Sequence, residues 1–216
     1  MSAALDLHRQ FPPGATPPAP PHVVARAPET QAADQLAATM RLVKSARFNA
    51  AERLARKQAV SLFTQTIVAL YFIGLAVWQA IYFGQIDDAS NRLMTFIQIV
   101  SSVFTLMLGL LEALNDYPMK AHHLHNCALV VSELSQELKI ARLTDPREVQ
   151  EFRKKYHDAL KSCPVNHNRI DYLFAKLDGK GDARAWSSVY VRYVIDVYGL
   201  YALFLAVPPL LWWVHQ

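Results

Sequence analysis

The sequence predicts an all-α membrane protein: a two-span transmembrane helical hairpin, with a basic amphipathic helix before it, and cytoplasmic helices and a third apolar helix after it. Residues 58–86 contain no Asp, Glu, Lys or Arg, and about 20 apolar residues suffice to cross a bilayer. A second charge-free run covers 93–111. Basic side chains crowd just before the first run, since residues 33–59 carry a net charge of +4.

The N-terminal part divides into a tail and a helix. Residues 1–32 are expected to be a disordered Pro- and Ala-rich tail, because seven of the twelve prolines lie between residues 10 and 28 and such a segment cannot bury a core. From 33 to 59 apolar residues recur every three or four positions, with Arg and Lys on the other faces. This pattern predicts a basic amphipathic helix, and no helix breaker separates it from the apolar run.

The transmembrane hairpin is expected to cover 60–114, with spans at 60–83 and 93–114 and a short acidic loop at 84–91. Basic residues precede the first span and avoid the loop, so the positive-inside rule puts both ends of the hairpin in the cytoplasm. The basic charge has no nucleic-acid-binding pattern beside it, and we expect no direct nucleic-acid contact.

A cytoplasmic helical segment is expected at 118–182. Apolar and small residues step by three and four over Leu124–Ala141, a heptad seam that we expect to oligomerise or to receive a signal. Asp145 as N-cap and Pro146 at the first helical position start the next helix, and another helix follows Pro164.

The third apolar segment is expected at 189–216. Residues 197–214 carry no charge, but Pro208 and Pro209 divide them. Proline is tolerated in membrane helices when neighbours satisfy the freed carbonyls. We expect a kinked third span that leaves the C-terminus outside; the alternative is a re-entrant or interfacial helix packed on the hairpin.

Polar and small residues share one face of the second span, at steps of four and three. At about 1.5 Å per residue they cover roughly 37 Å of helix, and a polar side chain that faces lipid leaves hydrogen-bonding groups unpaired. We therefore expect this set, the polar stripe, to face protein or water. Its members are Asn91, Thr95, Gln98, Ser102, Thr105, Gly109, Glu112 and Asp116.

Two interpretations of the polar stripe are open. In the first, small and hydroxyl residues let helices approach and bond to one another. In the second, several copies arrange their stripes around an aqueous pore, with Glu112 and Asp116 as an acidic ring at the cytoplasmic mouth. Two or three spans are too few to enclose water, so a pore requires a homo-oligomer. Both interpretations can hold at a protomer interface.

The sequence contains no pattern typical of an enzyme, and we expect no catalytic residue, cofactor or metal. Serine-hydrolase, zinc-protease, P-loop and dinucleotide motifs are missing from it. His122, His123 and His125 follow one another at spacings of one and two, and residues at these spacings do not face each other on a helix. His167 and Asp171 are expected to form a hydrogen-bonded pair at a helix start, with Asn166 as N-cap. Cys127 and Cys163 are expected to be reduced thiols.

The basic helix and one later motif resemble a known family. The helix contains Arg47–Leu54 (RFNAAERL), and after the hairpin comes Pro164–Tyr172 (PVNHNRIDY). Together they resemble the SLATT domain, the SMODS and SLOG-associating two-transmembrane effector domain of bacterial conflict systems, over roughly 41–178. The Pro-rich tail and the third apolar segment depart from a plain two-span pattern. The polar residues that match the family motif are Arg47, Asn49, Arg53, Asn166, His167 and Asp171.

The resemblance implies a function. Such a protein is an anti-phage effector of the bacterial inner membrane, which oligomerises and forms a pore or disrupts the membrane when an upstream sensor is activated. Implied partners are the lipid bilayer and a cyclic-nucleotide-producing nucleotidyltransferase, a SLOG sensor or a reverse-transcriptase module. The alternative is a membrane-anchored interaction module that recruits a cytoplasmic partner without forming a pore.

Overall fold

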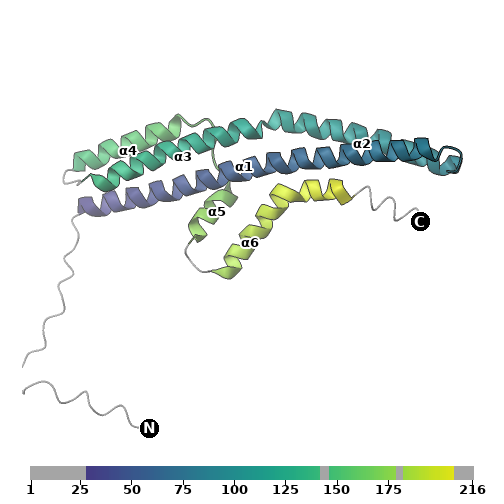
Figure 1. The fold of residues 1–216 in the computed structure, drawn as a ribbon. Helices are drawn as coiled ribbons and strands as arrows, with labels where there is room; N and C mark the ends of the chain where they lie inside the picture. The colour runs from purple at the N-terminus through teal and green to yellow at the C-terminus, as the bar shows by residue number, and fades with distance from the viewer. Residues whose placement is uncertain (1–27, 142–145, 179–181, 207–216) are drawn as a thin grey trace, which may run out of the picture.

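A computed structural model describes residues 28–141, 146–178 and 182–206 (Figure 1), and every regular element in these ranges is a helix. The all-α class is thereby confirmed. The first helix, α1 (Pro28–Ile81), is 54 residues long and joins the expected amphipathic helix and first span without a break. It begins before residue 33, inside the expected tail, because proline suits the first helical position, where its missing N–H is not needed.

The second helix, α2 (Asp88–Asn115), returns antiparallel to α1 (Figure 1). Gly84 turns the chain with a φ of 87°, a conformation that glycine adopts without steric cost. The Asp87 side chain accepts a hydrogen bond from the Ser90 N–H at 2.9 Å and so caps α2. The helix therefore starts inside the loop that was expected at 84–91.

The third helix, α3 (Tyr117–Ile140), follows α2 after a single residue. Asp116 has φ 46° and ψ 53°, the left-handed conformation, and Pro118 cannot donate a backbone hydrogen bond. These two residues separate the apolar α2 from the polar α3, while both helices keep running along α1 (Figure 1).

The heptad seam of α3 packs inside the protomer. Near the membrane, Leu124 and Ala121 contact Ala50, Ala51 and Leu54 of α1. Farther away, Val131 and Leu138 pack with Met40 of α1 and Tyr156 of the next helix. Within the protomer, α1 and this next helix therefore already cover the seam, and its part in oligomerisation or signalling stays a prediction.

Four further elements complete the described chain. Helix α4 (Pro146–Lys161) lies along α3, and α5 (Arg169–Leu177) contacts α1. Helix α6 (Ala183–Val194), capped by Asp182, passes into a π-helical turn, η1 (Ile195–Gly199), and then into an α-helix that continues to Ala206. The expected N-cap Asp145, Pro208, Pro209 and the end of the third span lie outside the described residues.

Three helices are long and apolar enough to cross a membrane, and lie within 31–81, 88–140 and 183–206. Many large apolar side chains on them are exposed, for example Leu106 at 77%. Exposed apolar surface of this extent needs lipid or protein around it. The chain is accordingly an all-α membrane protein, with a polar helical module at one end of the spans.

Candidate functional site

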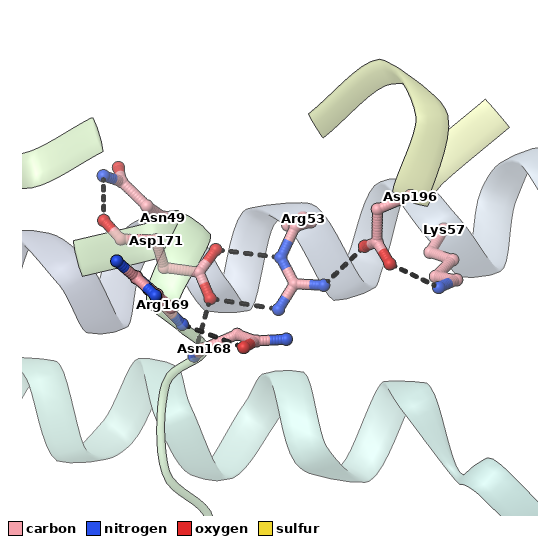
Figure 2. A network of polar contacts seen from close by, with 7 residues as sticks. All are labelled: Asn49, Arg53, Lys57, Asn168, Arg169, Asp171 and Asp196. Atoms are coloured by element: carbon pink, nitrogen blue, oxygen red, sulfur yellow. Dashed lines mark hydrogen bonds and ion pairs between the residues drawn. The ribbon is translucent and has the colours of Figure 1, made fainter. Parts of the chain in front are cut away.

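A buried ion pair joins α1 to α5. Arg53 Nε donates to Asp171 Oδ1 at 2.8 Å and Arg53 Nη2 donates to Asp171 Oδ2 at 3.0 Å (Figure 2). The two residues are only 6% and 1% exposed. A two-point Arg–carboxylate contact is strong and directional, which a pair so far removed from water requires.

The same arginine also reaches the third apolar segment. Arg53 Nη1 donates to Asp196 Oδ2 at 2.8 Å, and Lys57 Nζ lies 3.3 Å from Asp196 Oδ1 (Figure 2). Burial lowers the pKa of Arg53, but the hydrogen bonds and charges of Asp171 and Asp196 outweigh burial and raise it. Arg53 stays charged and joins α1, α5 and η1. We call Arg53, Lys57, Asp171 and Asp196 the ion network.

Asp171 also organises the start of α5. Its Oδ2 accepts from the Asn168 N–H at 3.0 Å, while the Asn168 side chain caps the helix in return. The N-cap is therefore Asn168 and not Asn166, because only Asn168 stands three residues before an acidic side chain that completes a capping box. Among the described residues, Asn166 Oδ1 accepts only from the neighbouring N–H of His167, at 2.9 Å.

His167 does not bond to Asp171, so the expected helix-start pair is wrong. Its ring stacks on Tyr172 with centroids 6.3 Å apart, and its Nδ1 is buried without a partner among the described residues. Burial and the charge of Arg47 lower the pKa of His167, and Asp171 raises it less. His167 is thus held neutral beside the ion network.

Arg47 and Asn49 connect the same part of α1 to α3 and α5. Arg47 is buried and its Nη1 donates to the Cys127 Sγ, while its Nε has no partner among the described residues. Asn49 Nδ2 lies 3.5 Å from the backbone oxygen of Asp171.

Within the described residues no three His, Cys, Asp or Glu side chains gather into a possible metal site.

Glu112 connects three helices at one end of the polar stripe. This carboxylate is buried and accepts from the Ser61 hydroxyl, from Gln65 Nε2 at 2.8 Å and from the Tyr201 hydroxyl at 2.6 Å. Ser61 and Gln65 belong to α1, and Tyr201 follows η1. Gly109 lies beside the same contact, since a Cβ built on it would stand 3.5 Å from Gln65 Oε1.

At the other end of the stripe, Gln79 of α1 contacts Asn91 and Thr95. Gln79 Nε2 donates to Asn91 Oδ1 at 2.9 Å and lies 3.4 Å from Thr95 Oγ1. Polar groups therefore join α1 and α2 at both ends of the spans, as interhelical bonding between membrane helices requires.

The middle of the stripe is only partly covered. Thr95 and Ser102 are exposed, and their hydroxyls donate to their own helix, to Asn91 O at 2.9 Å and Gln98 O at 2.7 Å. Thr105 is half-buried and donates to Ser101 O at 2.9 Å. Gln98 is half-buried too, and its Nε2 has no partner among the described residues.

Sequence reasoning missed the contacts from the third segment to the rest of the site. Asp196 lies 143 positions from Arg53, and Tyr201 lies 89 positions from Glu112. One signal was available: Asp196 stands at the edge of an apolar helix, where a carboxylate needs a cationic partner, and Arg53 and Lys57 occupy the same position relative to the first span.

A comparison with protein-family models gives one match, to the model described as SMODS and SLOG-associating 2TM effector domain family 5, over residues 29–214. No curated protein and no solved structure matches the chain. The matched range is wider than the 41–178 inferred from the motifs and includes the third apolar segment, which therefore belongs to the family pattern.

Proposed function

Because the chain belongs to the SMODS and SLOG-associating 2TM effector domain family 5, we propose that it is a membrane effector whose copies assemble and open an aqueous pore. Activation by an upstream partner would rearrange the spans, so that the polar stripes of several copies surround the opening. No enzymatic step enters this proposal. The effector acts by letting ions cross the membrane of an infected cell.

The observation that carries the proposal is the uncovered middle of the polar stripe. Ser102 is exposed in this part of α2, and Thr105 is half-buried. Their hydroxyls bond to their own helix, which reduces the cost of resting against lipid. The same side chains can turn toward water or a second copy when the protein assembles, so α2 suits both a resting and an assembled state.

Gln98 adds a reason for rearrangement. Its Nε2 is buried in the protomer with no partner among the described residues. Asn91 contacts Gln79, and Gly109 lies beside Gln65. These two contacts fix how α2 is aligned along α1, and this alignment puts Gln98 opposite the apolar middle of the α1 span. A buried unpaired donor costs about 1–3 kcal/mol. An assembly that gives this amide a water or a partner recovers that free energy.

The topology follows from charge. Arg53, Arg56 and Lys57 flank the apolar part of α1, and the loop between α1 and α2 carries Asp87 and Asp88. We propose that the N-terminus and residues 118–182 lie in the bacterial cytoplasm, where basic flanks are retained. The helical module would then meet a nucleotidyltransferase, a SLOG sensor or a reverse-transcriptase partner on that side of the inner membrane.

Membrane potential tests the pore directly. The chain is expressed with its neighbouring genes, the cells are infected with phage, and a voltage-sensitive dye reports the potential. We expect depolarisation by the native chain and retained potential when Gln98, Ser102 and Thr105 are all replaced by Leu. The matched control replaces Ile99, Val103 and Met107, exposed on the opposite face, by Leu. Loss of potential in the stripe variant would contradict the pore.

A membrane-anchored interaction module is the second candidate. It is favoured by the interhelical use of Glu112, Gly109 and Asn91, which explains much of the stripe without a pore. Replacing residues 60–114 by an unrelated two-span hairpin separates the two functions. An anchor keeps its activity after this exchange, and a pore loses it.

A further inference from the structure

A cavity of about 360 Å³ opens between α1, α5 and α6, next to the ion network. This volume lies in the range of small-molecule sites, which are about 300–1,000 Å³. One wall is the polar face of α1 with Asn49 and Glu52, and the opposite wall is aromatic and belongs to α6. Arg53 and Asp171 of the ion network line one side of it, and no residue of the polar stripe does.

The aromatic wall is a row of three rings along α6. Trp186 and Tyr190 stack with centroids 5.1 Å apart, and Tyr190 and Tyr193 with centroids 6.4 Å apart. Phe174 of α5 meets Tyr193 edge-on at 5.6 Å. Trp186 and Tyr190 remain 49% and 46% exposed, so their π surfaces are available to a ligand.

The charges around the cavity favour a cation. Glu52, Asp171 and Asp178 line it together with Arg53 and Arg56, which gives one net negative charge. The three guanidinium nitrogens of Arg53 all bond to Asp171 or Asp196, and Arg56 pairs with Glu52. The Asp178 carboxylate makes no hydrogen bond or ion pair with any described residue. An anionic ligand would meet this carboxylate, whereas a cation is attracted.

We propose that this cavity binds a small organic cation. Its ammonium or guanidinium group lies with the rings of Trp186 and Tyr190 on one side and the carboxylates of Glu52 and Asp178 on the other. A cation over an aromatic ring is held by the ring's negative face, and more strongly once water is removed. A carboxylate beside the rings supplies charge and accepts N–H hydrogen bonds.

The ligand comes from the aqueous phase and not from a lipid headgroup. The apolar part of α1 starts at Val60, and Glu52 precedes it by eight residues, about 12 Å of helix. The headgroup layer adds only about 5–8 Å to each side of the hydrocarbon core. A lipid ammonium group therefore does not reach the centre of the cavity, and a dissolved cation does.

The test uses the full chain in an uncharged maltoside detergent, with choline as the probe and calorimetry as the readout. Its neutral isostere 3,3-dimethylbutan-1-ol has the same shape without the charge. We expect the alcohol to bind at least about tenfold more weakly, since the charge carries the attraction. Equal binding of the two probes, tighter binding of adenosine monophosphate, or no choline binding would overturn the proposal.

Variants locate the binding. Tyr190→Ala should weaken choline about five- to thirtyfold, and Tyr190→Phe, which keeps the ring, should restore most of the affinity. Glu52→Gln together with Asp178→Asn should abolish binding, because the cavity then has a net positive charge. Glu151→Gln breaks a comparable exposed pair with Lys155 on α4 and should leave binding unchanged. Native affinity in the Glu52/Asp178 variant would contradict the site.

Discussion

Removing the Asp171 carboxylate is the perturbation whose effect on stability can be worked out most completely. Asp171→Ala takes away both contacts to Arg53, at 2.8 and 3.0 Å, and the hydrogen bond from the Asn168 N–H at 3.0 Å. Loss of one partner from a buried ion pair costs about 3–5 kcal/mol, and loss of a cap about 1 kcal/mol. Arg53 keeps Asp196, which is partly exposed, and this contact offsets part of the loss. We expect a net destabilisation of about 3–4 kcal/mol.

The assay is urea unfolding of the full chain in maltoside micelles, followed by circular dichroism, with hydrogen exchange of the α5 amides as a local readout. Glu151→Gln removes an exposed pair with Lys155 at 3.8 Å and should cost no more than about 0.5 kcal/mol. A double-mutant cycle with Arg53→Met should give a coupling free energy above about 1.5 kcal/mol. If Asp171→Ala costs no more than the Glu151 control, the assignment of the ion network as the tie between α1 and α5 is refuted.

Three further predictions concern single side chains. Burial lowers the pKa of His167 in the folded chain. The contribution of His167 to the free energy of unfolding is therefore complete above about pH 6.5, and it is lost as the pH falls and the unfolded chain takes up the proton. His167→Gln should make the free energy of unfolding in urea depend less on pH between pH 7 and 5, and an unchanged slope would contradict this. Burial and a hydrogen bond with Cys163 raise the pKa of Cys127 to about 12. Mass spectrometry should therefore find Cys127 unmodified by iodoacetamide at pH 8 until the chain unfolds. Rapid labelling of Cys127 in the folded chain would contradict this prediction. Tyr201→Phe removes the hydroxyl that donates to Glu112 at 2.6 Å and should lower the free energy of unfolding by about 1–2 kcal/mol; native stability would show that this bond does not hold the third segment.

The helices were predictable because their signals are local. The charge-free run at 58–86 and the lack of a breaker before it indicate one long helix, which α1 is. The fold class and the family followed from such local patterns. The heptad seam of α3 was equally visible, but a seam specifies only that some helix must cover it. The covering helix is α1 of the same chain, because its small residues Ala50 and Ala51 allow close approach.

The site was only partly predictable because its contacts are long-range. Arg53 and Asp171 were both identified from the family motif, but the motif does not say that they bond to each other across 118 positions. The choice between Asn166 and Asn168 as N-cap was open to sequence reasoning, since only Asn168 has an acidic residue three positions later. Asp196 and Tyr201 had no motif, and only folding brings them to Arg53 and Glu112.

Cysteine accessibility along α2 tests the central claim most directly. Single cysteines at 98, 102 and 105, and at 99, 103 and 107 on the opposite face, are introduced into a chain in which Cys127 and Cys163 are replaced by Ala. A membrane-impermeant thiol reagent is then applied to cells after activation. We predict rapid modification at 98, 102 and 105 and none at 99, 103 and 107. Modification confined to 99, 103 and 107, or none at any position, would contradict an aqueous path along the polar stripe.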